Sequence, residues 1–317
     1  MSKKTAIIPL SACLLMLLLV SQGCNKIRDY FPNGNTPKKS IAAIVSSSKD
    51  YSMLKLALER ADLLKTLDQP GTFTVFVPDN SAFEKAGATV ELIESAPVET
   101  LKNVLLFHVI GSKITASQIP EGNNTAVTSL LGAALYVSKS GSKVSVNGSG
   151  VTRADIEANN GVIHGIDRVL VPPAGNIVEV AKSNPALSYL VAAVVRASQG
   201  TTNVAALLSG DGPLTVFAPT NQAFINAGFP TIESINAAKP DDLTPILAYH
   251  VITDRVFSTN LVDGGQPSTF AGETLTIDLS SGAAVKGKSN TTKSKIGPAD
   301  IVTTNGVVHV IDQVLLP

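Results

Sequence analysis

The 317-residue sequence contains no tryptophan, only two cysteines and no excess of charge of either sign. Because 25 basic side chains balance 25 acidic ones, the chain lacks the basic surface that sequence-independent nucleic-acid binding requires. Two cysteines exclude a disulfide framework or a cysteine-rich zinc fold. The lack of tryptophan, with only five tyrosines, removes the usual stacking platforms for sugars and bases. The 44% of hydrophobic residues is enough for a folded core, and the length suggests about two domains.

The N-terminus has the pattern of a secretory signal peptide. Lys3 and Lys4 precede an apolar run from Ala6 to Val20, which is followed by small and polar residues. The run is shorter than the roughly 20 residues that span a bilayer, which disfavours a permanent membrane helix. We therefore expect residues 1–23 to be a signal peptide.

Gly23 and Cys24, at the end of the apolar run, resemble the lipobox of bacterial lipoproteins, in which the cysteine carries the lipid and becomes the mature N-terminus. Ser21 departs from that pattern, which normally has leucine there, and ordinary cleavage that leaves Cys24 as a free thiol is the alternative. The polar residues 24–37 lack helical or strand periodicity and read as a lipidated tether. The expected location is the bacterial cell envelope, lipid-anchored, at the surface or periplasmic face of the outer membrane.

The rest of the chain contains two copies of one sequence pattern. Three blocks recur in the same order 141 to 145 residues later: TFTVFVPDNSAFEKAG (72–87) as PLTVFAPTNQAFINAG (213–228), LKNVLLFHVI (101–110) as LTPILAYHVI (243–252), and ADIEANNGVIHGIDRVLVPP (154–173) as ADIVTTNGVVHVIDQVLLP (299–317). A period of that length fits tandem globular domains and is too long for a solenoid. We expect domain 1 over residues 38–173 and domain 2 over residues 174–317.

Each copy predicts both strands and helices. Alternating Phe73, Val75 and Val77 indicate a strand that Pro78 ends. Upstream, apolar residues at helical spacing predict a helix with a buried face, namely Leu54, Leu58 and Ala61 in the first copy and Leu187, Leu190, Val194 and Ala197 in the second. Asn160-Gly161 and Asn305-Gly306 accept positive φ, which predicts a tight turn before the last strand. Apolar residues on both faces of that strand predict a central position in the sheet.

The motifs TVFAPTNQAF and NGVVHVIDQVLLP, with a Tyr-His dipeptide between them, resemble the fasciclin domain family. The resemblance covers about residues 38–317 as two complete copies. It implies an α+β fold in which each domain is a wedge-shaped β-sandwich with helices packed at one side. It also implies a secreted or surface location and a role in adhesion or matrix binding.

The resemblance also suggests candidate binding residues. Animal members carry integrin-recognition motifs around an Asp-Ile pair, and Asp155-Ile156 and Asp300-Ile301 match only that core, so integrin binding does not carry over. Tyr249 is a further candidate because domain 1 has Phe107 at the matching position, so a contact through the phenol hydroxyl exists only in domain 2.

All four histidines occupy matched positions of the repeats: His108, His164, His250 and His309. Two equivalent metal sites are one interpretation, but no cysteine or second ligand stands at the required spacing. The favoured interpretation is a structural one, in which each neutral imidazole donates at one nitrogen and accepts at the other. We therefore expect no metal and no cofactor.

No nucleophile, base and orienting group can be assembled from the sequence, and no GxSxG-type elbow occurs, so we expect no enzyme. One charged cluster stands out, formed by Lys286, Lys288, Lys293 and Lys295 without an intervening acid. It is a candidate contact for an anionic glycan or lipid, although lysines that protect an exposed hairpin edge are the favoured interpretation.

The sequence thus predicts a non-catalytic adhesion or binding module of the cell envelope. The expected partner is a polysaccharide or a surface or matrix protein, met through two tandem domains that raise avidity for a repeating ligand. The alternative is an accessory glycan-capture lipoprotein of an outer-membrane polysaccharide uptake system. No nucleic-acid partner is expected.

Overall fold

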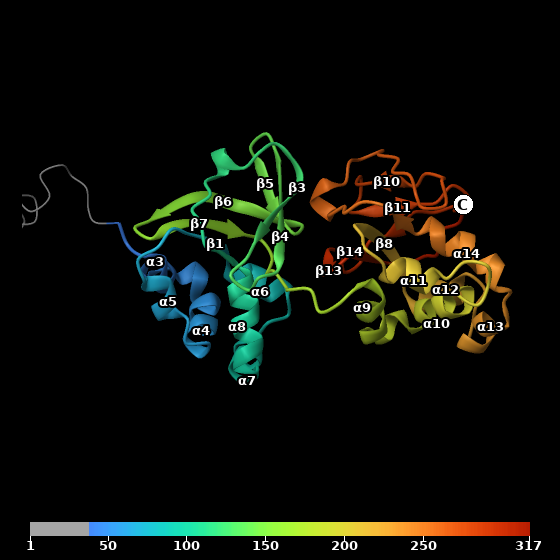
Figure 1. The fold of residues 1–317 in the computed structure, drawn as a ribbon, viewed down its shortest axis with the longest axis horizontal. Coiled ribbons are helices and arrows are strands. Elements are labelled where there is room, and N and C mark those ends of the chain that lie inside the picture. The colour runs from blue at the N-terminus through green and yellow to red at the C-terminus, as the bar shows by residue number, and fades with distance from the viewer. Residues whose placement is uncertain (1–37) are drawn as a thin grey trace, which may run out of the picture.

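The computed structural model describes residues 38–317, which form two similar halves side by side (Figure 1). The predicted signal peptide, Cys24 and the tether lie outside the described residues. The first half has the helices α3 (Ile41–Ser47), η1 (Lys49–Tyr51), α4 (Ser52–Arg60), α5 (Leu64–Asp68), α6 (Asn80–Lys85), α7 (Val90–Ser95), α8 (Val98–Phe107) and η2 (Ala116–Gln118). Its strands are β1 (Phe73–Pro78), β2 (Val109–Ile110), β3 (Gly122–Thr128), β4 (Ala134–Ser140), β5 (Lys143–Val146), β6 (Ser149–Ala158) and β7 (Gly161–Ile166).

The second half repeats the order with shorter outer strands. Its helices are α9 (Ile177–Ser183), η3 (Pro185–Leu187), α10 (Ser188–Ala197), α11 (Val204–Ser209), α12 (Asn221–Asn226), α13 (Ile232–Ala237), α14 (Pro240–Tyr249) and η4 (Ser258–Asn260). Its strands are β8 (Leu214–Pro219), β9 (Val251–Ile252), β10 (Thr276–Asp278), β11 (Ala284–Lys286), β12 (Ser294–Lys295), β13 (Ile301–Thr303) and β14 (Gly306–Ile311).

The last strand of each half is central, as its two apolar faces predicted. In the first half β7 pairs in parallel with β1 and antiparallel with β6, and in the second half β14 lies between β8 and β13. The second half has two sheets, ordered β13-β14-β8-β9 and β10-β11-β12. In the first half the hydrogen-bonded strands run continuously as β2-β1-β7-β6-β5-β4-β3, because the ten-residue β6 takes part in both layers.

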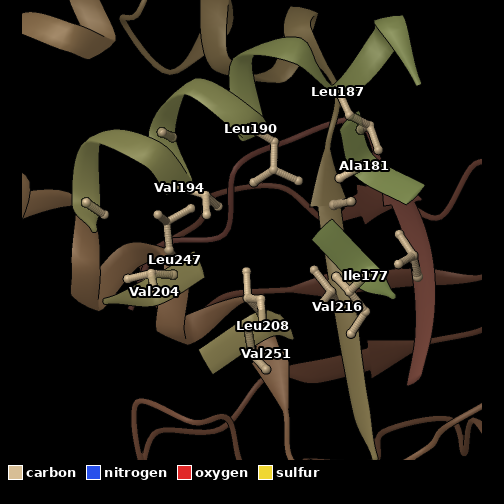
Figure 2. Close-up of a cluster of buried hydrophobic side chains, with 14 of the residues drawn as sticks. Ile177, Ala181, Leu187, Leu190, Val194, Val204, Leu208, Val216, Leu247 and Val251 are labelled. Atoms are coloured by element: carbon tan, nitrogen blue, oxygen red, sulfur yellow. The ribbon is translucent and has the colours of Figure 1, made fainter. Parts of the chain in front are cut away.

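The predicted apolar stripes face a core between helices and sheet. Leu54, Leu58 and Ala61 are buried, as are the matching residues of η3 and α10. Figure 2 shows this core in the second half, where Leu190 and Val194 of α10 lie near Val216 of β8 among other aliphatic side chains. A second cluster on the opposite face of the sheet includes Phe217, Tyr249 and Ile311. Each half therefore has two apolar layers, one on each face of its central parallel strands.

The asparagine before each final strand has a role that the turn prediction missed. The predicted tight turn before the last strand is confirmed, because two-residue turns join β6 to β7 and β13 to β14. Neither Asn160 nor Asn305 has positive φ in these turns. Instead, the buried Asn160 side chain accepts from Ile41 N at 2.9 Å and donates to Leu67 O and Gln69 O at 2.7 and 2.9 Å. Asn305 makes the same three contacts, to Ile177 N, Leu208 O and Gly210 O. Each amide therefore ties the first helix of its half to the central strand.

Candidate functional site

The two predicted Asp-Ile pairs lie in different surroundings. The Asp300 side chain is only 4% exposed and accepts from Ser258 N at 2.6 Å, from the Ser258 hydroxyl and from Arg168 Nη1 at 2.7 Å. Arg168 comes from the first half, so this carboxylate joins the two halves. Asp300 is therefore occupied within the chain, contrary to its expected binding role.

Asp155 has the same backbone geometry but no such partner. Both aspartates have positive φ, 58° at Asp155 and 63° at Asp300, and each accepts from the first backbone N–H of a 3₁₀-helix, η2 or η4. Asp155 accepts from Ala116 N at 2.9 Å and is exposed. Ile156 and Ile301 are half-buried and pack against apolar cores. Of the two Asp-Ile pairs, the first alone presents its carboxylate to solvent.

A second contact between the halves is built around Arg255. Its guanidinium lies 3.9 Å from the centre of the Tyr136 ring and donates to Gly306 O at 2.8 Å, while its carbonyl accepts from the Asn124 side chain. Arg255 is buried, and the loss of hydration lowers the pKa of its guanidinium. Phe257 packs beside the Tyr136 ring, with 6.3 Å between ring centres. Aromatic, cation–π and ionic contacts thus hold the halves together.

Hydrogen bonds and a close backbone approach complete the contact. Thr259 Oγ1 donates to Ser145 Oγ and Asn260 donates to Asn123, both at 3.0 Å. At the turn between β5 and β6, a Cβ on Gly148 would lie 2.3 Å from Asp300 Cγ, and its φ is +78°. Only glycine fits this position without displacing the carboxylate.

The contact residues are not repeated between the two halves. Thr74 and Thr215 occupy the same position in the two halves, and the hydroxyl of each bonds to the backbone on both sides of one residue. That residue is Lys113 in the first half and Arg255 in the second, so Thr115 corresponds to Phe257. Equivalent bonds from Ser149 and Ser294 likewise match Arg168 with Gln313. The surfaces of the two halves that lie outside the contact therefore do not carry a second set of the contact residues.

The fold and the duplicated geometry agree with a comparison against known families, in which the Fasciclin domain matches residues 49–172 and 187–317. The chain belongs to the fasciclin family. Fasciclin domains are generally adhesion or extracellular-matrix binding modules.

The relatives span animals and bacteria. The chain is 30% identical over 295 residues to transforming growth factor-beta-induced protein ig-h3 of Sus scrofa. This alignment covers 88% of this chain and 41% of that protein. It is 40% identical over 136 residues to Protein sll1483 of Synechocystis sp., covering 42% of this chain and 74% of that protein. A solved fasciclin domain pair from the insect cell adhesion molecule Fasciclin I aligns with 85% of this chain and 98% of that chain, at 19% identity and a TM-score of 0.40. The chain thus spans less than half of the mammalian relative.

Two histidines connect the end of a helix to the segment after the last strand of their fasciclin domain. His108 Nδ1 contacts Val104 O at 2.7 Å, and Leu170 N donates to its Nε2 at 2.9 Å. His250 repeats both contacts, with Ile246 O and Leu315 N. Burial lowers the pKa of each imidazole to about 4, so both rings are neutral near pH 7.

The other two histidines lie on the central strands. His164 Nε2 contacts Ile114 O at 2.9 Å and its Nδ1 accepts from Asp155 N at 3.3 Å. His309 repeats this with Val256 O and Asp300 N, and burial lowers its pKa. The nitrogens of all four rings are occupied by backbone groups, and residues 38–317 contain no group of three or more potential metal ligands.

Tyr249 is buried at the centre of the second fasciclin domain. Its hydroxyl donates to Thr274 O at 2.7 Å and accepts from Lys288 N at 3.0 Å. Both roles of the hydroxyl are therefore filled inside the domain. The expected binding role would need an exposed hydroxyl, whereas the Tyr249 side chain is fully buried.

The lysine cluster is partly neutralised. Lys288 pairs with Glu273 at 3.1 Å and Lys293 with Asp278 at 3.0 Å. Hydrogen bonds from Ser280 and Lys293 lower the pKa of Asp278 to about 2. Within residues 38–317, the side chains of Lys286 and Lys295 have no ion-pair partner. The predicted cationic surface is thus smaller than the sequence suggested.

Asp167 and Asp312 directly follow the central strands β7 and β14. Asp167 accepts from Ser149 Oγ and Gly150 N at 2.9 and 2.8 Å, and Asp312 accepts from Ser294 Oγ and Lys295 N at 3.0 and 2.8 Å. These carboxylates therefore hold the first residues of β6 and of β12. No helix within residues 38–317 is long and apolar enough to cross a membrane.

Proposed function

We propose that this chain is a non-catalytic adhesion or binding module of the bacterial cell envelope. A lipid on Cys24 holds it at the outer membrane, and the tether separates the paired fasciclin domains from the lipid. The partner is a polysaccharide or a surface or matrix protein. The observation that carries the proposal is the contact between the domains, because Arg168, Asp300, Arg255 and Tyr136 support a single two-domain surface in place of two independently swinging domains.

A fixed pair changes how two domains can contribute to binding. Independent domains gain avidity through effective concentration, whereas a rigid pair adds the advantage that its sites are already oriented. The exposed Asp155 of the first domain and the unpaired Lys286 and Lys295 of the second are our proposed contact residues. They provide one acidic and one basic region for a polar polymer.

We propose residues 38–173 and 174–317 as the bounds of the two domains. The matched family ranges begin after α3 and α9. The hydrogen bonds from Ile41 to Asn160 and from Ile177 to Asn305 support including each of these helices in the domain that follows it.

Glycan capture beside an uptake system is the second candidate function. A cavity of about 610 Å³ lies between the domains and is lined by polar groups that include Asn124, Tyr136, Asp211 and Asp254. This volume lies within the range of small-ligand sites, roughly 300–1,000 Å³. Such a cavity fits a short soluble saccharide better than an extended surface.

Arrays of polysaccharides and matrix proteins distinguish these functions. Adhesion predicts retention on immobilised polymer that falls when either domain's contact residues are changed, as in Asp155→Ala or the pair Lys286→Ala and Lys295→Ala. Glycan capture predicts saturable binding of one soluble saccharide that these changes leave intact. Cys24→Ala tests the anchor separately, because loss of the lipid should release the chain into the soluble fraction.

A further inference from the structure

A second cavity is lined only by residues of the first fasciclin domain. Its volume is about 250 Å³, and its walls come from β1, the β3–β4 hairpin and the segment around η2. Phe76, Ile119, Val127 and Val137 supply apolar surface. An empty apolar cavity of about 150 Å³ is already enough to bind benzene, so this space is sufficient for a small apolar group.

The polar groups at the base of the cavity do not require a polar ligand. Thr74 Oγ1 donates to Ser112 O at 2.6 Å and accepts from Ile114 N at 2.8 Å. Both ring nitrogens of His164 contact backbone groups, as described above. Because these groups are already paired, the interior favours an apolar occupant.

The rim, in contrast, has polar groups that lack an ion-pair or hydrogen-bond partner within the described residues. The Lys113 ammonium has no ion-pair partner within residues 38–317 and is exposed, and Gln118 Nε2 donates to no group there. Glu157 is the acid that faces Lys113, but it pairs with Lys38. The rim therefore offers one cation and one amide donor to a ligand that enters the cavity.

The same rim is blocked in the second domain. Its counterparts of Lys113 and Gln118 are Arg255 and Asn260, which contact Tyr136 and Asn123 of the first domain. The combination of an open rim, a free cation and an apolar interior thus belongs to the first domain.

We propose that this cavity binds a small amphiphile with an apolar body and an anionic head, such as a medium-chain fatty acid. The apolar body lies between Val127, Val137 and Phe76, where burial removes hydrocarbon surface from water. The carboxylate lies at the rim, where Lys113 supplies the opposite charge and Gln118 a hydrogen bond. Nothing in this binding requires the adhesive role, so the two proposals stand or fall independently.

Titration calorimetry with octanoate and octanol tests the proposal on the full chain carrying Cys24→Ala, which has no acyl chain of its own to compete. We expect saturable binding of octanoate at one site. Val127→Phe, which fills the cavity, should weaken octanoate binding at least tenfold, whereas Val262→Phe adds the same bulk at an exposed site of the second domain and should have no effect.

Lys113→Gln tests the head group without disturbing buried residues. It should weaken octanoate binding about fivefold and leave octanol binding unchanged, because a solvent-exposed ion pair contributes little more than that. Lys143→Gln, at an exposed lysine of β5 outside the cavity, is the matched control. Absence of saturable octanoate binding, or equal binding by Val127→Phe with an unchanged circular dichroism spectrum, would overturn the site. An equal effect of Lys113→Gln on octanoate and octanol would overturn the anionic head.

Discussion

Arg168 of the first fasciclin domain donates a hydrogen bond to Asp300 of the second at 2.7 Å, and the Asp300 side chain is 4% exposed. The matching residue of the first domain, Asp155, is exposed. One position of the repeated domain therefore has two different surroundings in this chain. In the second domain it joins the two domains, and in the first its carboxylate is exposed to solvent.

Arg168→Ala should loosen the contact between the domains. The change leaves a nearly buried carboxylate without its cation, and we expect a loss of about 1–3 kcal/mol in the unfolding free energy of the second domain. Urea denaturation measures this loss, and small-angle scattering should show a larger radius of gyration. Arg153→Ala is the control, because its 3.7 Å contact with Asp50 is exposed on both sides and should contribute no more than about 0.5 kcal/mol. Equal effects of the two changes would contradict the assigned role of Arg168.

The positions where the two repeats differ include three residues of the contact between the domains. Arg255, Phe257 and Arg168 all occur where the other copy has a different residue type, while the histidines and the Asn-Gly pairs are identical in both. The shared histidines and asparagines maintain the fold, and the three differing residues join the copies. Asp300 is an exception, because both copies have this aspartate and only the one in the second domain takes part in the contact. The sequence cannot show which differing residues meet, because the contact depends on the relative orientation of the domains.

The apolar periodicity predicted the helices and central strands because both repeats bury those faces in the same way. The binding residues were harder to predict. Tyr249 and Phe107 differ by a hydroxyl, and only the packing around Thr274 and Lys288 shows that this hydroxyl is used internally. Two of the lysines pair with acids 15 residues earlier in the chain, one in β10 and one just before it. Burial and ion pairing of this kind depend on tertiary contacts that residue type alone does not specify.

Acid should destabilise both domains through His108 and His250. Their folded pKa of about 4 lies below the ordinary value of 6.5, so the unfolded chain binds more protons between these two values. Stability is therefore fully present above about pH 6.5 and falls as the pH drops toward 4, by about 3 kcal/mol for each histidine. Urea unfolding at intervals from pH 7.5 to 4 measures the effect.

A His250→Gln variant provides the control for this pH dependence. It should be less stable at pH 7, and its second domain should lose less further stability between pH 6.5 and 4 than the wild type does. An unchanged pH profile in this variant would show that another group controls acid unfolding.

Asn160→Ala should destabilise the first domain by about 2–4 kcal/mol. The change removes an acceptor for Ile41 N and a donor to two carbonyls, and it leaves buried backbone groups without partners. Thermal unfolding measures the loss, and Asn305→Ala should act similarly on the second domain. At the exposed Asn226, substitution by alanine should change stability by less than about 0.5 kcal/mol.

Tyr249→Phe should lower the stability of the second domain by about 1–2 kcal/mol, because the hydroxyl that joins Thr274 O and Lys288 N is lost. Tyr189→Phe, which removes a more exposed hydroxyl with one contact to Pro230 O, should have a smaller effect. Polymer retention should be the same for Tyr249→Phe as for wild type. Loss of retention at full stability would restore Tyr249 as a binding residue.

The central claim is that the paired domains form an envelope-anchored adhesion or binding module. Retention of cells on surfaces coated with polysaccharides or matrix proteins tests it most directly, with cells that express the wild-type chain, the Cys24→Ala chain or no chain. The account predicts that at least one coating retains wild-type cells, and that retention falls to the level of cells without the chain when Cys24 is replaced. Equal retention of all three kinds of cell on every coating would contradict it.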